Sequence, residues 1–142
     1  MSRRGEDGTA LVELVLLGII LLVPLVWVLL SVFEVQRGAF ASTSAARSAA
    51  RAFALADTDA AGEADARAAI RQAFDDQGGA GRDFRFAVSC GSADCHTAGE
   101  VITVRVWTRV DLPLLPGILG GDAPSVALDA THTVPVGQFR DL

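Results

Sequence analysis

Near its N-terminus the chain carries 20 consecutive residues without a charge, LVLLGIILLVPLVWVLLSVF, from Leu14 to Phe33. Seventeen of these 20 side chains are apolar. At a rise of about 1.5 Å per residue, a helix of this length reaches roughly 30 Å, the thickness of a bilayer's hydrocarbon core. The run therefore predicts a membrane-spanning helix, in which Pro24 removes one backbone hydrogen bond and favours a bend. Trp27 lies too deep in the run for an interfacial position, so we interpret it as a packing residue.

Two other interpretations of the run stay open. A buried helix of a soluble protein has the same composition, but so small a chain could hardly surround it. A cleaved secretory signal has a shorter apolar core of about 7–15 residues, and no small-residue cleavage site follows Phe33.

The rest of the chain has an ordinary soluble composition. The 142 residues include 17 acidic and 12 basic side chains, for a net charge of −5. This balance excludes a strongly basic nucleic-acid binder, and the length excludes a multidomain enzyme. We expect one small domain of about 100 residues beyond the span and no nucleic-acid partner.

Charge alone does not orient the span, because arginines flank it on both sides. They are Arg3 and Arg4 before the run, and Arg37, Arg47 and Arg51 after it. The two cysteines are more informative: Cys90 and Cys95, with four residues between them, predict a short disulfide loop in an oxidising compartment. We therefore expect a single-pass protein of the cytoplasmic membrane, with its N-terminus in the cytoplasm and its C-terminal domain outside.

Glu13 is the residue that fits a plain anchor least, because a carboxylate at the start of an apolar span is costly unless it is paired. Cleavage after Gly8 would make Thr9 the new N-terminus, with a free ammonium group. Between staggered helices, that ammonium and the Glu13 carboxylate can neutralise each other.

The segment Gly8-Thr9-Ala10-Leu11-Val12-Glu13, followed by the apolar run, resembles the class III signal of type IV prepilins. Together with Pro24, the Glu34 and Arg37 pair and the alanine-rich segment after them, it resembles the TadE/TadG-like proteins, pseudopilins of the tight-adherence (Flp-type) pilus machinery. The resemblance is clearest over residues 8–56.

The resemblance implies a non-catalytic role in pilus assembly. A prepilin peptidase would cleave between Gly8 and Thr9, and Glu13 would set the register between helices. The other implied partners are further pilus or pseudopilin subunits and the membrane platform of the assembly machine. Flp pilins are much shorter, which favours a minor or assembly component. The alternative is an uncleaved single-pass protein whose head binds another envelope component.

The helix is expected to continue beyond the span to about Ala56, because residues 34–56 are rich in alanine and contain only Gly38 as a breaker. This segment is either a plain stalk or a filament-packing surface. The predicted organisation is a leader at 1–8, a transmembrane helix at 9–33, a helical stalk at 34–56 and an exported head at 57–142.

The head has the pattern of a small α+β domain. Thr58 or Asp59 can cap a second helix, which ends at the glycines after Gln77. Its expected buried face consists of Ala66, Ala69, Ile70, Ala73 and Phe74. Three period-two segments then predict strands, within residues 84–90, 101–110 and 126–136. The expected fold is a long N-terminal transmembrane helix that continues into a pilin-like head with a second helix and a three-stranded antiparallel sheet.

An aliphatic loop separates the last two predicted strands. It either folds back onto the helix or forms a patch for a partner or the bilayer. The side chains concerned are Leu112, Leu114, Leu115, Ile118 and Leu119.

Candidate catalytic and metal-binding groups are few. Cys90, Cys95, His96 and His132 match no zinc-finger spacing, and a disulfide explains both cysteines. The carboxylates form no recognisable catalytic pair. We expect neither an enzyme nor a bound metal or cofactor.

Overall fold

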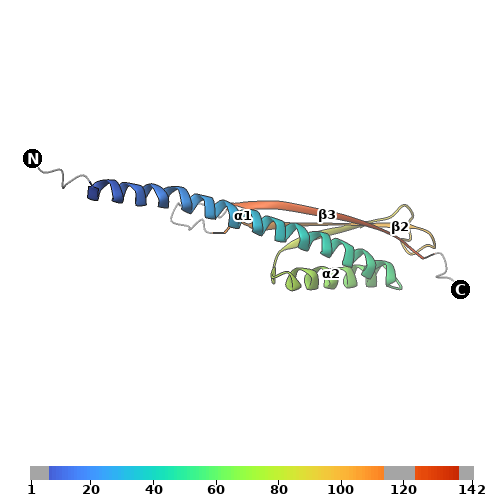
Figure 1. Cartoon of the computed structure of the whole chain (residues 1–142). Helices are drawn as coiled ribbons and strands as arrows, with labels where there is room; N and C mark the ends of the chain where they lie inside the picture. Colours follow the sequence, from blue (N-terminus) through green and yellow to red (C-terminus); the bar gives the residue numbers. More distant parts are fainter. Residues whose placement is uncertain (1–6, 114–123, 138–142) are drawn as a thin grey trace, which may run out of the picture.

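The protein has an α+β fold in which a long helix carries a second helix and a three-stranded antiparallel sheet. The computed structural model describes residues 7–113 and 124–137. In chain order the elements are α1 (Asp7–Leu55), α2 (Asp59–Asp76), β1 (Phe84–Ser89), β2 (Val101–Asp111) and β3 (Ser125–Pro135). Figure 1 shows the N-terminal half of α1 projecting alone, while its C-terminal half lies along α2 and the sheet.

Helix α1 is continuous over 49 residues and passes through Pro24 and Gly38. Two serine hydroxyl groups donate to backbone carbonyls one turn earlier in the helix. Ser31 Oγ lies 2.9 Å from Trp27 O, and Ser42 Oγ lies 2.8 Å from Gly38 O. The expected continuation of the apolar run into a long helix is therefore observed, ending one residue before Ala56.

The alanine-rich part of α1 forms one side of the core of the head. Its small side chains allow α2 and the sheet to approach the helix backbone closely. The alanines Ala41, Ala45, Ala46, Ala49 and Ala50 are all at most 2 % exposed. We expected residues 34–56 to form a stalk, free or packed on neighbouring molecules. The structure instead places their alanine side inside the head, where it packs with Phe53, Ile70 and Phe74.

Helix α2 folds back along α1 (Figure 1). Of the two expected caps, Thr58 is the one observed: its extended backbone precedes the helix, and its side chain accepts from Ala61 N at 3.3 Å. The buried face matches the expected one with two differences: Ala69 is only half-buried, and Gly62, one turn before Ala66, is also buried. A Cβ at Gly62 would lie 2.9 Å from the Phe53 ring, so a glycine is needed where the two helices approach.

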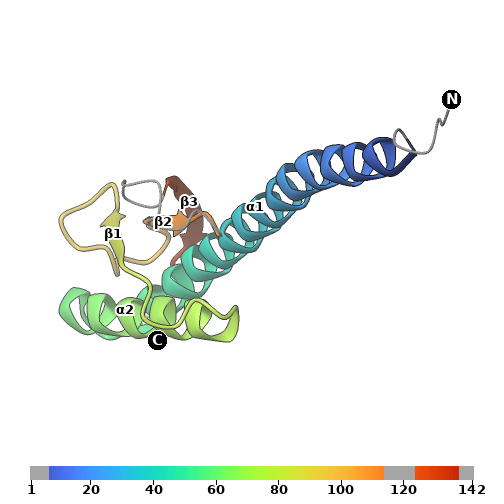
Figure 2. The same cartoon turned by 90° about the vertical axis from the view of Figure 1, so that its left-hand side faces the viewer.

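The sheet has the order β1-β2-β3, with both pairs antiparallel. Phe86, Val106 and Ala130 lie opposite one another in the register. The inner face of β2 supplies the buried side chains Ile102, Val104, Val106, Thr108 and Val110. Figure 2 shows the strands and α2 gathered against the C-terminal half of α1.

The first strand is shorter than expected. We expected its alternation to include Cys90, but β1 ends at Ser89. Cys90 turns away from the ladder because it forms a disulfide within the loop that follows. The third strand begins at Ser125 and ends at Pro135, one residue earlier at each end than the expected segment.

Candidate functional site

The N-terminal half of α1 is an exposed apolar surface. Every side chain from Thr9 to Val26 is exposed. The large hydrophobic side chains between Leu11 and Phe33 are 41–69 % exposed, apart from that of Trp27, which is half-buried. Among the described residues, α1 is the one helix that is long and apolar enough to cross a membrane, and only 6 % of its most apolar window is buried. A core helix of a soluble protein would be covered, whereas this half of α1 is not, and by its length and composition it could span a membrane.

The residues of the predicted signal lie at the start of this surface. Helix α1 begins at Asp7, so the Gly8–Thr9 bond lies in its first turn. Glu13 is exposed one turn beyond Thr9, on the projecting half of the helix. The structure thus brings these three residues together at one end of the exposed helix, far from the head.

In the part of the chain that the structure describes, the head contacts α1 at Trp27, inside the apolar run. Trp27 Nε1 donates to Pro113 O at 2.7 Å, just beyond the end of β2. There the end of β2 is joined to the residue before β3 by a hydrogen bond from Leu112 N to Pro124 O at 2.9 Å. Further along the helix, Ser31 is the first buried side chain. Trp27 is therefore a packing residue as expected, and its partner is the end of the sheet.

Of the five aliphatic side chains predicted to matter in the loop, Leu112 is the one that the structure describes. Leu112 is half-buried and contributes to the closure of the β2–β3 connection. Leu114, Leu115, Ile118 and Leu119 lie outside the described residues, so their contact with a partner or membrane stays a prediction.

The disulfide between Cys90 and Cys95 is formed, as predicted, with the two Cα atoms 5.5 Å apart. Glu100, the residue directly before β2, stabilises the same loop. Its Oε1 accepts from Gly91 N at 2.8 Å and from Val101 N at 3.1 Å. Hydrogen bonds from the Ser92 side chain and from these two backbone N–H groups hold the pKa of Glu100 below its ordinary value.

His96 joins this loop to the ends of both helices. Its Nδ1 lies 2.7 Å from Asp59 Oδ1 at the start of α2, and its Nε2 lies 2.9 Å from Phe53 O in the last turn of α1. The ring also stacks on Phe53, with centroids 5.1 Å apart. From the disulfide loop, the ring thereby contacts both helices at once. His96 is thus a structural clamp on the α1–α2 corner.

Sequence reasoning considered His96 only as a candidate metal-binding or catalytic residue and missed this clamp. Asp59 and Phe53 are 37 and 43 residues away, and no local pattern signals such a contact. Asp59, Asp94 and His96 do bring three ligand atoms within 4.8 Å of one another. However, Asp59 and Phe53 already occupy both ring nitrogens, and Asp94 accepts from His96 N at 2.9 Å. The cluster is therefore explained by its own hydrogen bonds.

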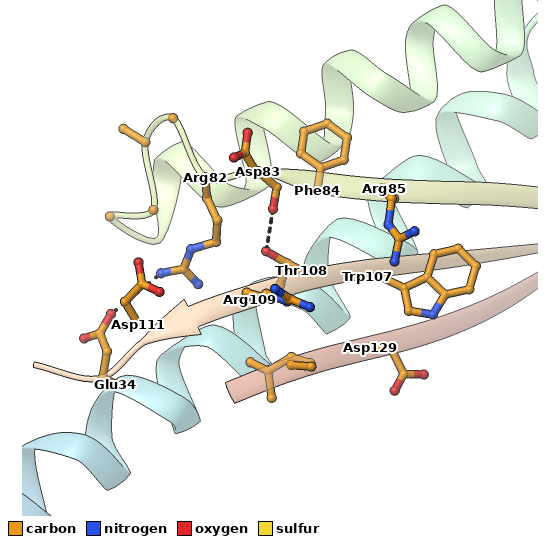
Figure 3. A pocket seen from close by; sticks show the side chains of 16 residues that line it. Glu34, Arg82, Asp83, Phe84, Arg85, Trp107, Thr108, Arg109, Asp111 and Asp129 are labelled. Carbon is orange, nitrogen blue, oxygen red and sulfur yellow. Dashed lines mark hydrogen bonds and ion pairs between the residues drawn. The ribbon is translucent and has the colours of Figure 1, made fainter. Parts of the chain in front are cut away.

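An open hollow lies between the Gly78–Gly81 turn, Glu34 of α1 and the neighbouring part of the sheet (Figure 3). Arg82 spans it toward Glu34, with 3.7 Å between Nη2 and Oε1, so Glu34 pairs with the head as well as with Arg37. Thr108 Oγ1 donates to Asp83 O at 2.8 Å. Charged side chains of both signs line this hollow, which is open to solvent. The ion pair between Arg82 and Glu34 holds the turn against α1.

No protein-family model, curated protein or solved structure matches this chain. The resemblance to TadE/TadG-like proteins therefore depends on the residues of the N-terminal segment alone.

Proposed function

We propose that this protein is a minor pseudopilin of the TadE/TadG-like kind, which acts without catalysis in the assembly of a tight-adherence type IV pilus or a related secretion system. The observation that carries the proposal is the construction of α1. Its N-terminal half is an exposed apolar rod, and its C-terminal half is part of the core of the head. A pseudopilin needs this combination, because the rod must stay in lipid while the folded head is presented outside.

The proposed location follows from the same features. The rod spans the cytoplasmic membrane with the N-terminus inside, and the pilin-like head lies outside, where an oxidising compartment maintains the Cys90–Cys95 disulfide. The proposed partners are pilus or pseudopilin subunits, the membrane platform of the assembly machine and a prepilin peptidase.

Processing would occur between Gly8 and Thr9. That bond lies in the first turn of α1, at the N-terminal end of the exposed rod. Removal of residues 1–8 would leave the Thr9 ammonium one turn from Glu13. In an apolar bundle, the Glu13 carboxylate of one chain would then pair with the Thr9 ammonium of a staggered neighbour and set the helix register.

The test of processing is mass spectrometry of the mature N-terminus in cells that express a prepilin peptidase. We expect Thr9 as the first residue, and we expect Gly8→Val to leave the chain uncut. Gly18→Val is the matched control, because it makes the same change in the exposed helix away from the cleavage site. An intact Met1 in the unaltered protein would overturn the proposal in favour of an uncleaved envelope protein.

The role of Glu13 has a separate test. Glu13→Ala should leave the protein in the membrane fraction and reduce its co-purification with other pilus subunits at least tenfold. Glu63→Ala is the control, because Glu63 is an exposed acid on α2, within the head. Undiminished assembly of Glu13→Ala would remove the proposed role of this carboxylate.

A further inference from the structure

The position of the head along α1 limits how much of the apolar run is free to contact lipid. Every side chain from Thr9 to Val26 is exposed. From Trp27 onward the head covers one side of the helix: Trp27 is half-buried and Ser31 is buried, while residues 28–30, Val32 and Phe33 stay 41–65 % exposed. On the covered side, Trp27 Nε1 donates to Pro113 O at 2.7 Å. Figure 1 shows the sheet reaching further toward the N-terminal half of α1 than α2 does.

The free segment has the length of a membrane span. The 18 residues from Thr9 to Val26 extend over about 27 Å as a helix, close to the roughly 30 Å of a hydrocarbon core. A span from Leu14 to Phe33 would instead place Trp27 about 9 Å below the bilayer surface. It would take the irregular backbone at Leu112, Pro113 and Pro124 to the same depth.

Irregular backbone at such depth must have every polar group bonded within the protein, because no water is present there to bond it. Near the surface of the bilayer the same groups are hydrated. A tryptophan is also favoured there, since its ring is apolar and its N–H requires an acceptor.

We propose that the bilayer surface meets this protein at Trp27 and the Leu112–Pro113 end of the sheet, so that the membrane span is Thr9–Val26. The head then rests directly on the lipid headgroups, with no stalk between them. This inference depends on the proposed membrane anchoring and specifies its depth. With this span, Glu13 lies about 6 Å deeper in the hydrocarbon than Thr9. A carboxylate at that depth is costly unless it is paired, so it needs a counter-ion from a neighbouring chain.

The two tryptophans make this depth measurable, because they lie at different distances from the proposed surface. Trp107 lies on the outer face of β2 with the Arg105 guanidinium 5.1 Å from its ring. It is six residues before Pro113, which places it about 20 Å further from the bilayer. Trp107→Phe leaves Trp27 as the single fluorophore, and Trp27→Phe leaves Trp107 as the matched control.

The experiment reconstitutes the full chain in phosphatidylcholine vesicles and first confirms by flotation that it is bound. For Trp27, lipids brominated near the headgroup end of the acyl chain should quench at least twice as strongly as lipids brominated near its methyl end. For Trp107, aqueous iodide should quench and neither brominated lipid should. Stronger quenching of Trp27 from the bilayer centre would overturn the inference, as would quenching of Trp27 by iodide alone.

A second measurement does not depend on fluorescence. The native cysteines are joined to each other, so an introduced cysteine is the single free thiol. A membrane-impermeant maleimide should label Leu30→Cys and not Val23→Cys, although both positions are exposed in the protein, by 41 % and 61 %. Protection of both thiols would show that the head lies deeper than proposed. Failure of the chain to float would overturn the membrane anchoring itself, which separates the two proposals.

Discussion

Gly38 of α1 packs directly against Val110 of β2. A Cβ placed on Gly38 would overlap Val110 Cγ2 and lie 2.9 Å from Leu128 Cδ1. The helix therefore approaches the sheet closely at a residue that, in the sequence, indicates only a break in helix propensity. The absence of a side chain at Gly38 sets the separation between α1 and two strands.

Gly38→Ala should lower the free energy of unfolding by about 1–3 kcal/mol, because the added methyl group forces Val110 and Leu128 out of place. An alanine would otherwise favour a helix by up to about 1 kcal/mol. Gly18→Ala is the control, since nothing lies within 4 Å of its added Cβ. Denaturant unfolding of the full chain in detergent, followed by tryptophan fluorescence, measures both changes. Equal stabilisation by the two substitutions would contradict the close contact.

The Cys90–Glu100 loop should loosen in acid. The folded-state pKa of Glu100 is lowered from its ordinary value of 4.5 by hydrogen bonds from Ser92, Gly91 and Val101. A carboxyl group with a lowered pKa stabilises the folded state above its unfolded pKa, and this contribution is lost as the pH falls through the folded pKa. We expect the amide proton of Gly91 to shift, by NMR, with a midpoint below 4.5. Glu100→Gln should abolish that transition, and a midpoint above 4.5 would refute the assignment.

His96→Ala should destabilise the corner between α1 and α2. It removes the hydrogen bonds to Asp59 and Phe53 together with the stack on the Phe53 ring. We expect a loss of about 1–3 kcal/mol, because the Phe53 carbonyl loses its side-chain partner, while the half-exposed Asp59 contributes less.

His96→Phe separates the two contributions, since it keeps the stack and loses both hydrogen bonds. Its stability should lie between those of the unaltered protein and His96→Ala, as measured by thermal unfolding in detergent. If His96→Ala unfolds at the same temperature as the unaltered protein, His96 is not a clamp.

The sequence was sufficient to predict the elements, because each has a periodic pattern of its own. The apolar run and the alanines predicted α1, and Thr58 marked the start of α2. Strict alternation from Ile102 to Val110 predicted the buried face of β2. The disulfide followed from two cysteines close together in a polar loop. These are local signals, and the structure confirms them.

The contacts between elements were not predictable in the same way. Periodicity shows that Ala45 and Ala49 share a face, but it does not show whether that face meets α2 or another molecule. The partners of Trp27 and His96 lie 86 and 37–43 residues away, so no window of sequence contains both sides of these contacts. The roles of Gly8, Thr9 and Glu13 stay predictions, because each requires a second protein.

The continuity of α1 couples the two ends of the molecule mechanically. One helix runs from the projecting rod to the alanines that form the core of the head, and Pro24 is the one proline within it. A pull or tilt applied near Thr9 therefore reaches the sheet through a single helix, and the outer face around Trp107 moves with it. If the proposed assembly machine grips one end, it acts on the other end through that helix.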